Sequence, residues 1–536
     1  MGNSKKFSRV DATKLLLCSV FVLFVFYPFA QMVISITPDD LRKVLTSSSF
    51  LPAVKNSLKA ACITTMISVS IGLTLAFAIQ RTNIRFKGAL SVLLTLPMLI
   101  PSISHGMGLV VLFGTNGVLR NLLGLEGTIY GFAGIITGSV LYSYPVAFLM
   151  LNDVLKYQDS SPYEAAQVLG IPKLRRTMAI TLPYLSKPLI SAVFTVFTMV
   201  ITDYGIPLMI GGKNTTLAMM MYQEVLGQLN FGKGSIIGLF LLIPAVITFV
   251  FNTLIKGRAK LSFVTRPFEI KKSKVRDGFA YTFCGLILFL VFLLFGAFCT
   301  IAFTRKYPSD MSLTFENVTK MLTLRGDTYL INSLIIAIFV SIIGITVAFI
   351  TAYLTTRMPS RLSSLLHLFS ITSLAIPGIV LGLSYAMTFG GSFLYGTMAI
   401  LILANIMHFF ASPYQMMYNS LSKMNENLEN VGQTLGISRI RMVFDVIIPQ
   451  CRATMVEMLS YFFVNSMMTI SAVSFLANVS TKPLSLMISQ FEGQVLYECA
   501  AVVSLVILAV NVLIKSLVYL INKRLTQKVR VNPANE

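Results

Sequence analysis

The segment Glu164-Ala-Ala-Gln-Val-Leu-Gly170-Ile171 returns later in the chain as Asn430-Val-Gly-Gln-Thr-Leu-Gly436-Ile437. A proline follows each copy at the same distance, at Pro183 and at Pro449. Repetition of a short segment at two widely separated points indicates that the chain consists of two related halves. The two copies therefore predict a duplicated architecture.

The composition around the repeated segments is that of a membrane protein. Of 536 residues, 55% are hydrophobic and 12% are charged, and tryptophan is absent, which excludes an ordinary soluble domain. Apolar runs of roughly 20 residues, the length that crosses about 30 Å of hydrocarbon, predict about twelve transmembrane helices in an all-α integral membrane fold. The runs lie near 15–36, 57–79, 90–113, 129–151, 189–210, 234–255, 279–303, 332–354, 365–389, 395–417, 456–478 and 498–521.

Basic residues predict the orientation, because Lys and Arg close to membrane spans remain on the cytoplasmic side. They gather at the N-terminus, in the loop after Arg81, around the first repeated segment, from Lys256 to Arg276 and at the C-terminus. Both termini and both repeated segments are therefore expected in the cytoplasm. The formal charge of +22 comes from these dispersed loops, which favours the lipid bilayer with its anionic headgroups as the partner and argues against nucleic acid.

Further matches extend the repeat beyond these segments. Asn56-Ser57-Leu58 recurs as Asn332-Ser333-Leu334, and Ile100-Pro101 recurs as Ile376-Pro377. Each half carries about six spans, an even number, so the repeats are parallel rather than inverted and share one pathway. The expected domains are a first half at 1–255, a basic cytoplasmic linker at 256–277 and a second half at 278–536. The remaining matches pair Arg81 with Arg357, Gly106 with Gly382, and Tyr130-Gly131 with Tyr395-Gly396.

The first repeated segment predicts a short helix with a defined end. Ser161 is expected to cap the helix, and Glu164 closes a capping box, so local chemistry alone explains the glutamate. Ala165 and Ala166 allow another surface to approach closely. Gly170 stands where a left-handed residue ends a helix, and a second helix is expected to continue toward the proline.

The second copy departs from the first at several positions. The glutamate is replaced by Asn430, and an acid stands one residue earlier, at Glu429. The second alanine is replaced by Gly432, whereas Gly436 and the later proline are retained. Asn427 is expected to cap this helix. These differences predict that the two helices share a role without contributing equally to it.

Two such loops, near 160–187 and 426–453 between the fourth and fifth spans of each half, resemble the EAA loops of binding-protein-dependent ABC importers. The resemblance implies a type I permease subunit of the bacterial inner membrane that is not itself an enzyme. It also implies two partners, an ABC ATPase dimer that uses ATP and Mg and an extracytoplasmic substrate-binding protein, with no cofactor bound by this chain. The coupling residues that the resemblance implies are Glu164, Ala165, Ala166, Gly170, Glu429, Gly432 and Gly436.

The residues predict no nucleotide, catalytic or metal site in this chain. Gly212-Lys213-Asn214 lacks the earlier glycine and the following Ser or Thr of a phosphate-binding loop. His105, His367 and His408 do not have the spacing of metal ligands, and no carboxylate pair or Ser/His pair converges. The energy for transport is therefore expected from a partner.

Polar residues inside spans predict the translocation path, because they are costly in a bilayer. Asp203 lies late in the fifth span beside Tyr204, just before a glycine and a proline that break helices. The equivalent stretch of the second half contains Thr469 and Ser471 and no acid. An asymmetric gate is one hypothesis for Asp203, and a helix cap or an ion pair near the outer interface is the alternative.

Two regions, residues 202–212 with 225–231 and residues 463–473, resemble fused permeases assigned to 2-aminoethylphosphonate import. That group is similar to the fused ferric-iron and thiamine permeases, so the resemblance implies an organophosphonate as the solute, with ferric iron or thiamine as alternatives. A proton- or sodium-coupled secondary transporter is the rival class. Scarce intramembrane acids and repeats that are not inverted argue against it.

Overall fold

The computed structural model describes the whole chain apart from residues 1–8, 125, 256–269, 271, 426 and 532–536. The chain separates into two compact units. Unit 1 consists of residues 1–37, 322–487 and 506–536, and unit 2 consists of residues 38–321 and 488–505. The described residues are mainly helical, with one antiparallel pair of strands, β1 (Thr304–Lys306) and β2 (Asp310–Leu313), in unit 2.

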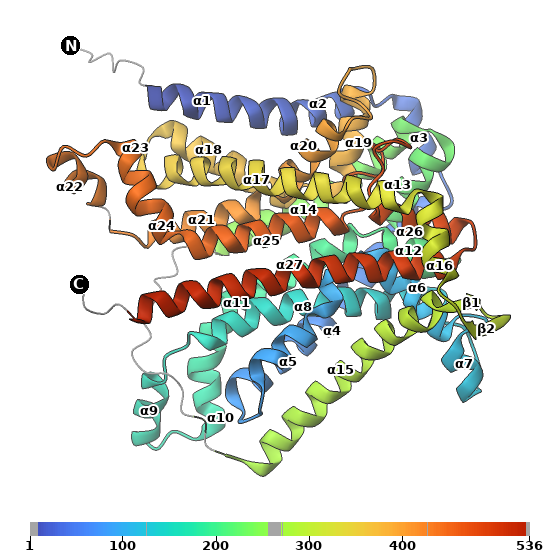
Figure 1. Cartoon of the computed structure of the whole chain (residues 1–536), viewed down its shortest axis with the longest axis horizontal. Coiled ribbons are helices and arrows are strands. Elements are labelled where there is room, and N and C mark those ends of the chain that lie inside the picture. The colour runs from blue at the N-terminus through green and yellow to red at the C-terminus, as the bar shows by residue number, and fades with distance from the viewer. Residues whose placement is uncertain (1–8, 125, 256–269, 271, 426, 532–536) are drawn as a thin grey trace. The chain divides into compact units, whose positions relative to one another are not determined.

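Each unit is a bundle of long apolar helices joined by short ones (Figure 1). Unit 1 holds α1 (Arg9–Phe21), α2 (Tyr27–Ile34), α17 (Asp327–Arg357), α18 (Arg361–Thr372), α19 (Gly378–Phe389), α20 (Met398–Phe409), α21 (Ala411–Ser422), α22 (Leu428–Thr434), α23 (Arg439–Met442), α24 (Ile448–Gln450) and α25 (Arg452–Met468). Unit 2 holds α3 (Pro38–Leu45), α4 (Phe50–Arg81), α5 (Lys87–Leu94), α6 (Ser102–Phe113), α7 (Val118–Leu123), α8 (Phe132–Lys156), α9 (Ser161–Val168), α10 (Lys173–Arg176), α11 (Leu182–Ile201), α12 (Gly205–Ile210), α13 (Leu217–Tyr222), α14 (Phe231–Ile255), α15 (Lys274–Ala302) and α16 (Glu316–Met321). Helices α26 (Ser485–Gly493) and α27 (Tyr497–Val531) are divided between the units.

The helices confirm the predicted all-α membrane fold. Among the described residues, nine helical segments are long and apolar enough to cross a bilayer, and two bent pairs raise the number to eleven. The bent pairs are α18–α19, with an angle of 106°, and α20–α21, with an angle of 52°. Helix α25, with 17 residues, covers most of the remaining predicted span, 456–478.

Two predicted spans, 90–113 and 365–389, are broken helices rather than single ones. The breaks fall at Ile100-Pro101 and Ile376-Pro377, where both isoleucines are in extended conformation. Proline lacks an amide hydrogen and its ring pushes the preceding residue out of the helical region, so a helix ends there. The repeated Ile-Pro pair therefore marks a break that both halves share.

In both halves, the repeated Asn-Ser pair makes hydrogen bonds to backbone amides and carbonyls of an irregular segment. In unit 2, the Asn56 amide group donates to a carbonyl at 3.2 Å, and the Ser57 hydroxyl accepts from the amide of Leu217 at 2.7 Å. In unit 1, Asn332 donates to two carbonyls at 2.9 and 3.1 Å, and Ser333 accepts from the amide of Leu484 at 2.7 Å. Backbone at membrane depth needs such partners because hydrocarbon offers none.

The compact units differ from the predicted halves by an exchange of their first spans and by residues 488–505, which belong to unit 2. Helix α1 belongs to unit 1, where the buried ammonium group of Lys14 donates to the Met358 carbonyl at 2.7 Å and to Ser360 Oγ at 3.0 Å. Helix α15 belongs to unit 2, where Asp277 accepts from the amide of Asn83 at 3.1 Å. The division at 255 and 278 stays a prediction, and most of the predicted linker, 256–277, lies outside the described residues.

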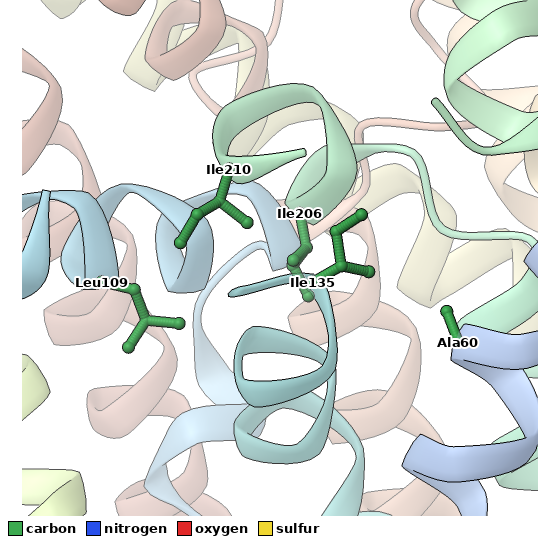
Figure 2. Close-up of a cluster of buried hydrophobic side chains, with 5 residues drawn as sticks. All are labelled: Ala60, Leu109, Ile135, Ile206 and Ile210. Carbon is green, nitrogen blue, oxygen red and sulfur yellow. The ribbon is translucent and has the colours of Figure 1, made fainter. Parts of the chain in front are cut away.

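A cluster of buried side chains fixes the short helix α12 in unit 2. Figure 2 shows Ile206 and Ile210 of α12 beside Ile135 of α8, with Leu109 of α6 and Ala60 of α4 around them. All five side chains are at most 3% exposed. This apolar contact holds α12 in place. Two of the predicted path residues, Asp203 and Tyr204, directly precede α12.

Candidate functional site: the two repeated loops and the helix breaks

Helix α9 carries the first repeated segment, and its cap differs from the prediction. The N-cap is Ser160 instead of Ser161. The Asp159 carboxylate accepts from the amide and the hydroxyl of Ser161 at 3.1 and 3.0 Å, which draws Ser161 into the first turn. The Ser160 hydroxyl donates to Glu164 Oε1 at 2.8 Å. Glu164 thus closes a local contact with Ser160 instead of the predicted box with Ser161.

The glycines Gly170 and Gly436 end the two loop helices in the same way. Their φ angles are +68° and +71°, in the left-handed region that side chains disfavour. In each copy, the following isoleucine donates its amide to the carbonyl five residues earlier, at 3.0 Å in the first loop and 2.8 Å in the second. This hydrogen bond is typical of a Schellman end. The predicted left-handed ends are therefore confirmed at both positions.

Helix α22 carries the second segment and is held by an ion pair. Asn427 occupies the N-cap position, but its side chain makes no capping bond there, in contrast to the prediction. Arg357, the last residue of α17, donates Nε to Glu429 Oε1 at 2.7 Å and Nη2 to the other carboxylate oxygen. The two side chains are 5% and 13% exposed. Burial raises the pKa of Glu429, but the guanidinium outweighs it and holds that pKa below its ordinary value.

The first loop has an equivalent attachment, in which an arginine meets neutral side chains in place of a carboxylate. Arg81, the last residue of α4, donates to the side-chain oxygen of Gln158. Gln158 Nε2 donates in turn to the Tyr163 hydroxyl at 2.9 Å, and this hydroxyl shares a hydrogen bond with Thr181. Tyr163 precedes Glu164 in the first segment as Glu429 precedes Asn430 in the second. The sequence marks the two arginines only as equivalent span ends, and the acid at Glu429 is the signal that could have identified the partner of Arg357.

The small residues of the two segments do not all face outward. Ala165 is exposed, whereas Ala166 is buried and its equivalent Gly432 is buried as well. A Cβ at Gly432 would lie 2.1 Å from Met442 Cε, so the glycine leaves room for that methionine. The exposed apolar surface comes from other residues. Leu169 and its equivalent Leu435 are 75% and 69% exposed, and Val168 beside the first is 88% exposed.

The backbone after each loop repeats as well. A π-helical turn, Thr177–Thr181 in the first half and Val443–Ile447 in the second, precedes Pro183 and Pro449. Such turns are rare and usually occur singly. Their presence at the same place in both halves extends the duplication to backbone detail. In Figure 1, α9 with α10 and α22 with α23 extend beyond the ends of the long helices of their own units.

Asp203 lies in a break between α11 and α12, where the sequence predicts one. Its carboxylate accepts from the amide of Ile206 at 3.0 Å and from the Ser102 hydroxyl at the start of α6. These contacts are those of a helix cap, the alternative that the sequence leaves open. Tyr204 is 2% exposed and stacks on Tyr222, with ring centroids 4.5 Å apart. A role of Asp203 and Tyr204 in the path stays a prediction.

The second half breaks its fifth span at the equivalent place. Helix α25 ends before Thr469, a buried residue whose carbonyl accepts from the Ser485 hydroxyl at 2.7 Å. Ser471 and the residue after it pack with their carbonyls against Gly382 of α19. In unit 2, Met209 Cβ and the Ile206 carbonyl oxygen lie 2.7 and 3.3 Å from the position that a Cβ of Gly106 in α6 would take. The repeated glycines thus let the backbone after each fifth span approach closely, while a path role of Thr469 and Ser471 stays untested.

The histidines make separate contacts. His105 Nδ1 lies 3.2 Å from the Pro101 carbonyl, and His367 Nδ1 lies 2.6 Å from the Tyr414 hydroxyl. Within the described parts of the chain, no group of three or more His, Cys, Asp and Glu side chains is arranged to hold a metal ion.

Several permease proteins of known transport systems resemble the chain. A putative ferric transport system permease protein, FbpB 1 of Haemophilus influenzae, is 25% identical over 87% of this chain and 78% of its own length. The ferric transport system permease protein FbpB of Actinobacillus pleuropneumoniae is 25% identical over 86% of this chain and 70% of its own length. The molybdenum transport system permease protein ModB of Azotobacter vinelandii is 29% identical over 33% of this chain and 80% of its own length.

A family match coincides with the internal repeat. Residues 68–261 and residues 341–527 each match the family described as binding-protein-dependent transport system inner membrane component. Each match begins within the second span of its half, in α4 or α17, and includes one repeated loop. Because the two matches cover more than half of the chain and follow its two repeats, the chain belongs to this family and is a fused, two-repeat permease of an ABC importer.

Proposed function

We propose that this inner-membrane permease imports ferric iron. The observation that carries the proposal is the extent of its ferric relatives, which align with 87% and 86% of the chain and thus with both halves. The molybdenum relative aligns with 33% of the chain, which is less than one half and close to the length of one of the two family matches. A solute that passes between two halves is better indicated by relatives that contain both.

Ferric iron is one of the alternatives that the sequence resemblance leaves open. An organophosphonate such as 2-aminoethylphosphonate, the solute that this resemblance favours, finds no support among the relatives described above, and neither does thiamine. An ion-coupled secondary transporter is a different class from the family to which the chain belongs.

The proposed contact with a separate ATPase is made by α9 and α22. Exposed leucines at equivalent positions, Leu169 and Leu435, give each helix an apolar patch without a partner in its own unit. A short helix with such a patch is suited to a groove on another protein. The proposed ATPase dimer would bind ATP and Mg, and the chain itself would bind no cofactor. The coupling residues that the sequence proposes, Glu164 to Gly170 and Glu429 to Gly436, lie in or directly after these helices.

Import would follow an alternating-access cycle. A binding protein delivers the solute on the outer side, and closure of the ATPase dimer moves α9 and α22 with the spans attached to them. Both termini lie on the ATPase side in this proposal. The helix breaks place Asp203 with Tyr204, and Thr469 with Ser471, next to irregular backbone, which supports them as path residues because such backbone is tolerated where it lines a cavity or is buried in protein.

Ferric iron is expected to stimulate the assembled transporter. With the chain, its co-purifying ATPase and its binding protein in proteoliposomes, ferric iron should raise ATP hydrolysis and enter the lumen. Uptake of ⁵⁵Fe(III) and phosphate release measure the two effects. Stimulation by 2-aminoethylphosphonate or thiamine in place of ferric iron would refute the proposed solute and leave the importer assignment intact.

Substitution of the loop glycines is expected to uncouple transport. Gly170→Val and Gly436→Val place a β-branched residue at positive φ, which costs about 1–2 kcal/mol or more and distorts the helix end. Each variant should insert normally and lose several-fold in solute-stimulated ATP hydrolysis.

The matched control for these variants is Gly88→Val. Gly88 has open space around its Cβ position and lies outside the loops. If both loop variants kept the stimulation of this control, the glycine-ended helices would have no role in coupling.

Asp203 is expected to act through its capping hydrogen bonds. Asp203→Asn keeps an acceptor for the Ile206 amide, so it should retain stability and uptake, whereas Asp203→Ala loses the cap at a cost of about 0.5–2 kcal/mol. Thermal unfolding and ⁵⁵Fe(III) uptake separate the variants. Loss of uptake in a stable Asp203→Asn protein would show instead that the negative charge itself is required in the path.

A further inference from the structure

Each loop helix is tied to the end of the second span of its half by an arginine. In unit 1, Arg357 closes α17 and reaches Glu429 in the first turn of α22. In unit 2, Arg81 closes α4 and reaches α9 through Gln158 and Tyr163. These contacts join each loop to a span of its own unit.

We propose that Arg357 and Glu429 form the rigid link through which movement of α22 reaches α17, whereas Arg81 serves the first loop through a weaker relay that passes through two neutral side chains. This inference rests on the proposed coupling role of the loops and identifies the residues that position them. It makes Arg357 a positioning residue of the transport cycle. It also makes the two loops mechanically unequal.

The geometry of Arg357 favours a rigid link. Two guanidinium nitrogens contact the two oxygens of Glu429, and the planar fork fits a carboxylate better than a single charge does. The same guanidinium donates to the carbonyls of Met424 and Asn425 at 3.2 and 2.7 Å. It therefore holds both the first turn of α22 and the chain that leads into it.

The other end of this link is fixed as well. Lys14 of α1 donates to the carbonyl of Met358, the residue after Arg357, and to Ser360. The Ser360 hydroxyl also accepts from the amide of Ser363 at 3.1 Å and caps α18. The turn at 358–360 is thus held by α1 and α18, so a force on Glu429 acts on a supported helix end.

In the first loop, the arginine meets a neutral amide in place of a carboxylate. The relay from Arg81 passes through the amide of Gln158 before it reaches Tyr163. The bond from Arg81 to Gln158 has a charged donor, but the bond from Gln158 to Tyr163 joins two neutral groups and is about half as strong as a charge-assisted one. The extra bond also makes the attachment less direct than the contact of Arg357 with Glu429. The unequal attachment accounts for one difference between the two segments. The second has an acid, Glu429, at the position where the first has Tyr163.

The test uses the full transporter with Arg357→Gln, Glu429→Gln and Arg357→Lys. Arg361→Gln is the matched control, because Arg361 is an exposed arginine at the start of α18 in the same region. Amide hydrogen exchange over residues 428–434 measures the attachment of α22. Uptake of ⁵⁵Fe(III) per ATP hydrolysed measures coupling, and the amount of co-purifying ATPase measures assembly.

The proposal expects exchange over 428–434 to become at least about tenfold faster in Arg357→Gln and Glu429→Gln, as for loss of a charged hydrogen bond. Uptake per ATP should fall about fivefold or more, a usual size for coupling between sites. Arg357→Lys should lie between the wild type and Arg357→Gln, and Arg361→Gln should match the wild type. Glu429→Gln keeps the side-chain shape, so it carries the test if Arg357→Gln does not fold.

Two results would overturn the inference while leaving the proposed function standing. One is unchanged exchange over 428–434 in both variants, which would mean that the pair does not hold α22. The other is faster exchange with unchanged uptake per ATP, which would mean that the attachment does not transmit movement. A wild-type chain that recruits no ATPase would remove the proposed coupling role and the inference with it.

Discussion

Backbone groups that leave a helix inside a bilayer need partners from the protein, and this constraint organises both halves of the chain. Hydrocarbon supplies no hydrogen bonds, so each break must be buried and satisfied by nearby side chains. Asp203 serves the break after α11, and the Asn-Ser pairs at 56–57 and 332–333 serve the irregular segments further on. The broken helices are therefore stable features of the fold, and they put irregular backbone where a solute path is expected.

A related constraint applies to the loops. A loop helix can transmit movement of the proposed ATPase only if it is attached to a transmembrane helix that moves with it. Schellman ends shape α9 and α22 in the same way, and the exposed leucines make them alike from outside. Their attachments differ inside, where a carboxylate meets Arg357 and an amide meets Arg81. A fused chain is free to evolve such a difference, since its two halves need not have the same sequence.

Features set by local sequence were predictable. Apolar runs identified the membrane helices, the glycines at 170 and 436 identified the helix ends, and glycine and proline after Asp203 identified a break. Features that depend on contacts between residues far apart in the sequence were not predictable. The Ile-Pro pairs at 100–101 and 376–377 lie inside the predicted apolar runs 90–113 and 365–389, so hydropathy alone merged two helices into one span. The acid at Glu429 is a signal for a basic partner, but Arg357 lies 72 residues earlier in the chain, and only the folded structure pairs the two. The shift of the first cap to Ser160 arises from Asp159, a competing acceptor outside the capping motif.

The central claim is that α9 and α22 form the contact with a separate ATPase. Photo-crosslinking from a reactive residue at Leu169 or Leu435 tests it directly in the assembled transporter, with Leu313 in β2, which is 86% exposed, as the control position. The account predicts crosslinks to the ATPase subunit from both loop positions and none from Leu313. Absence of crosslinks from both loops in an intact complex, or crosslinks from Leu313 instead, would contradict it.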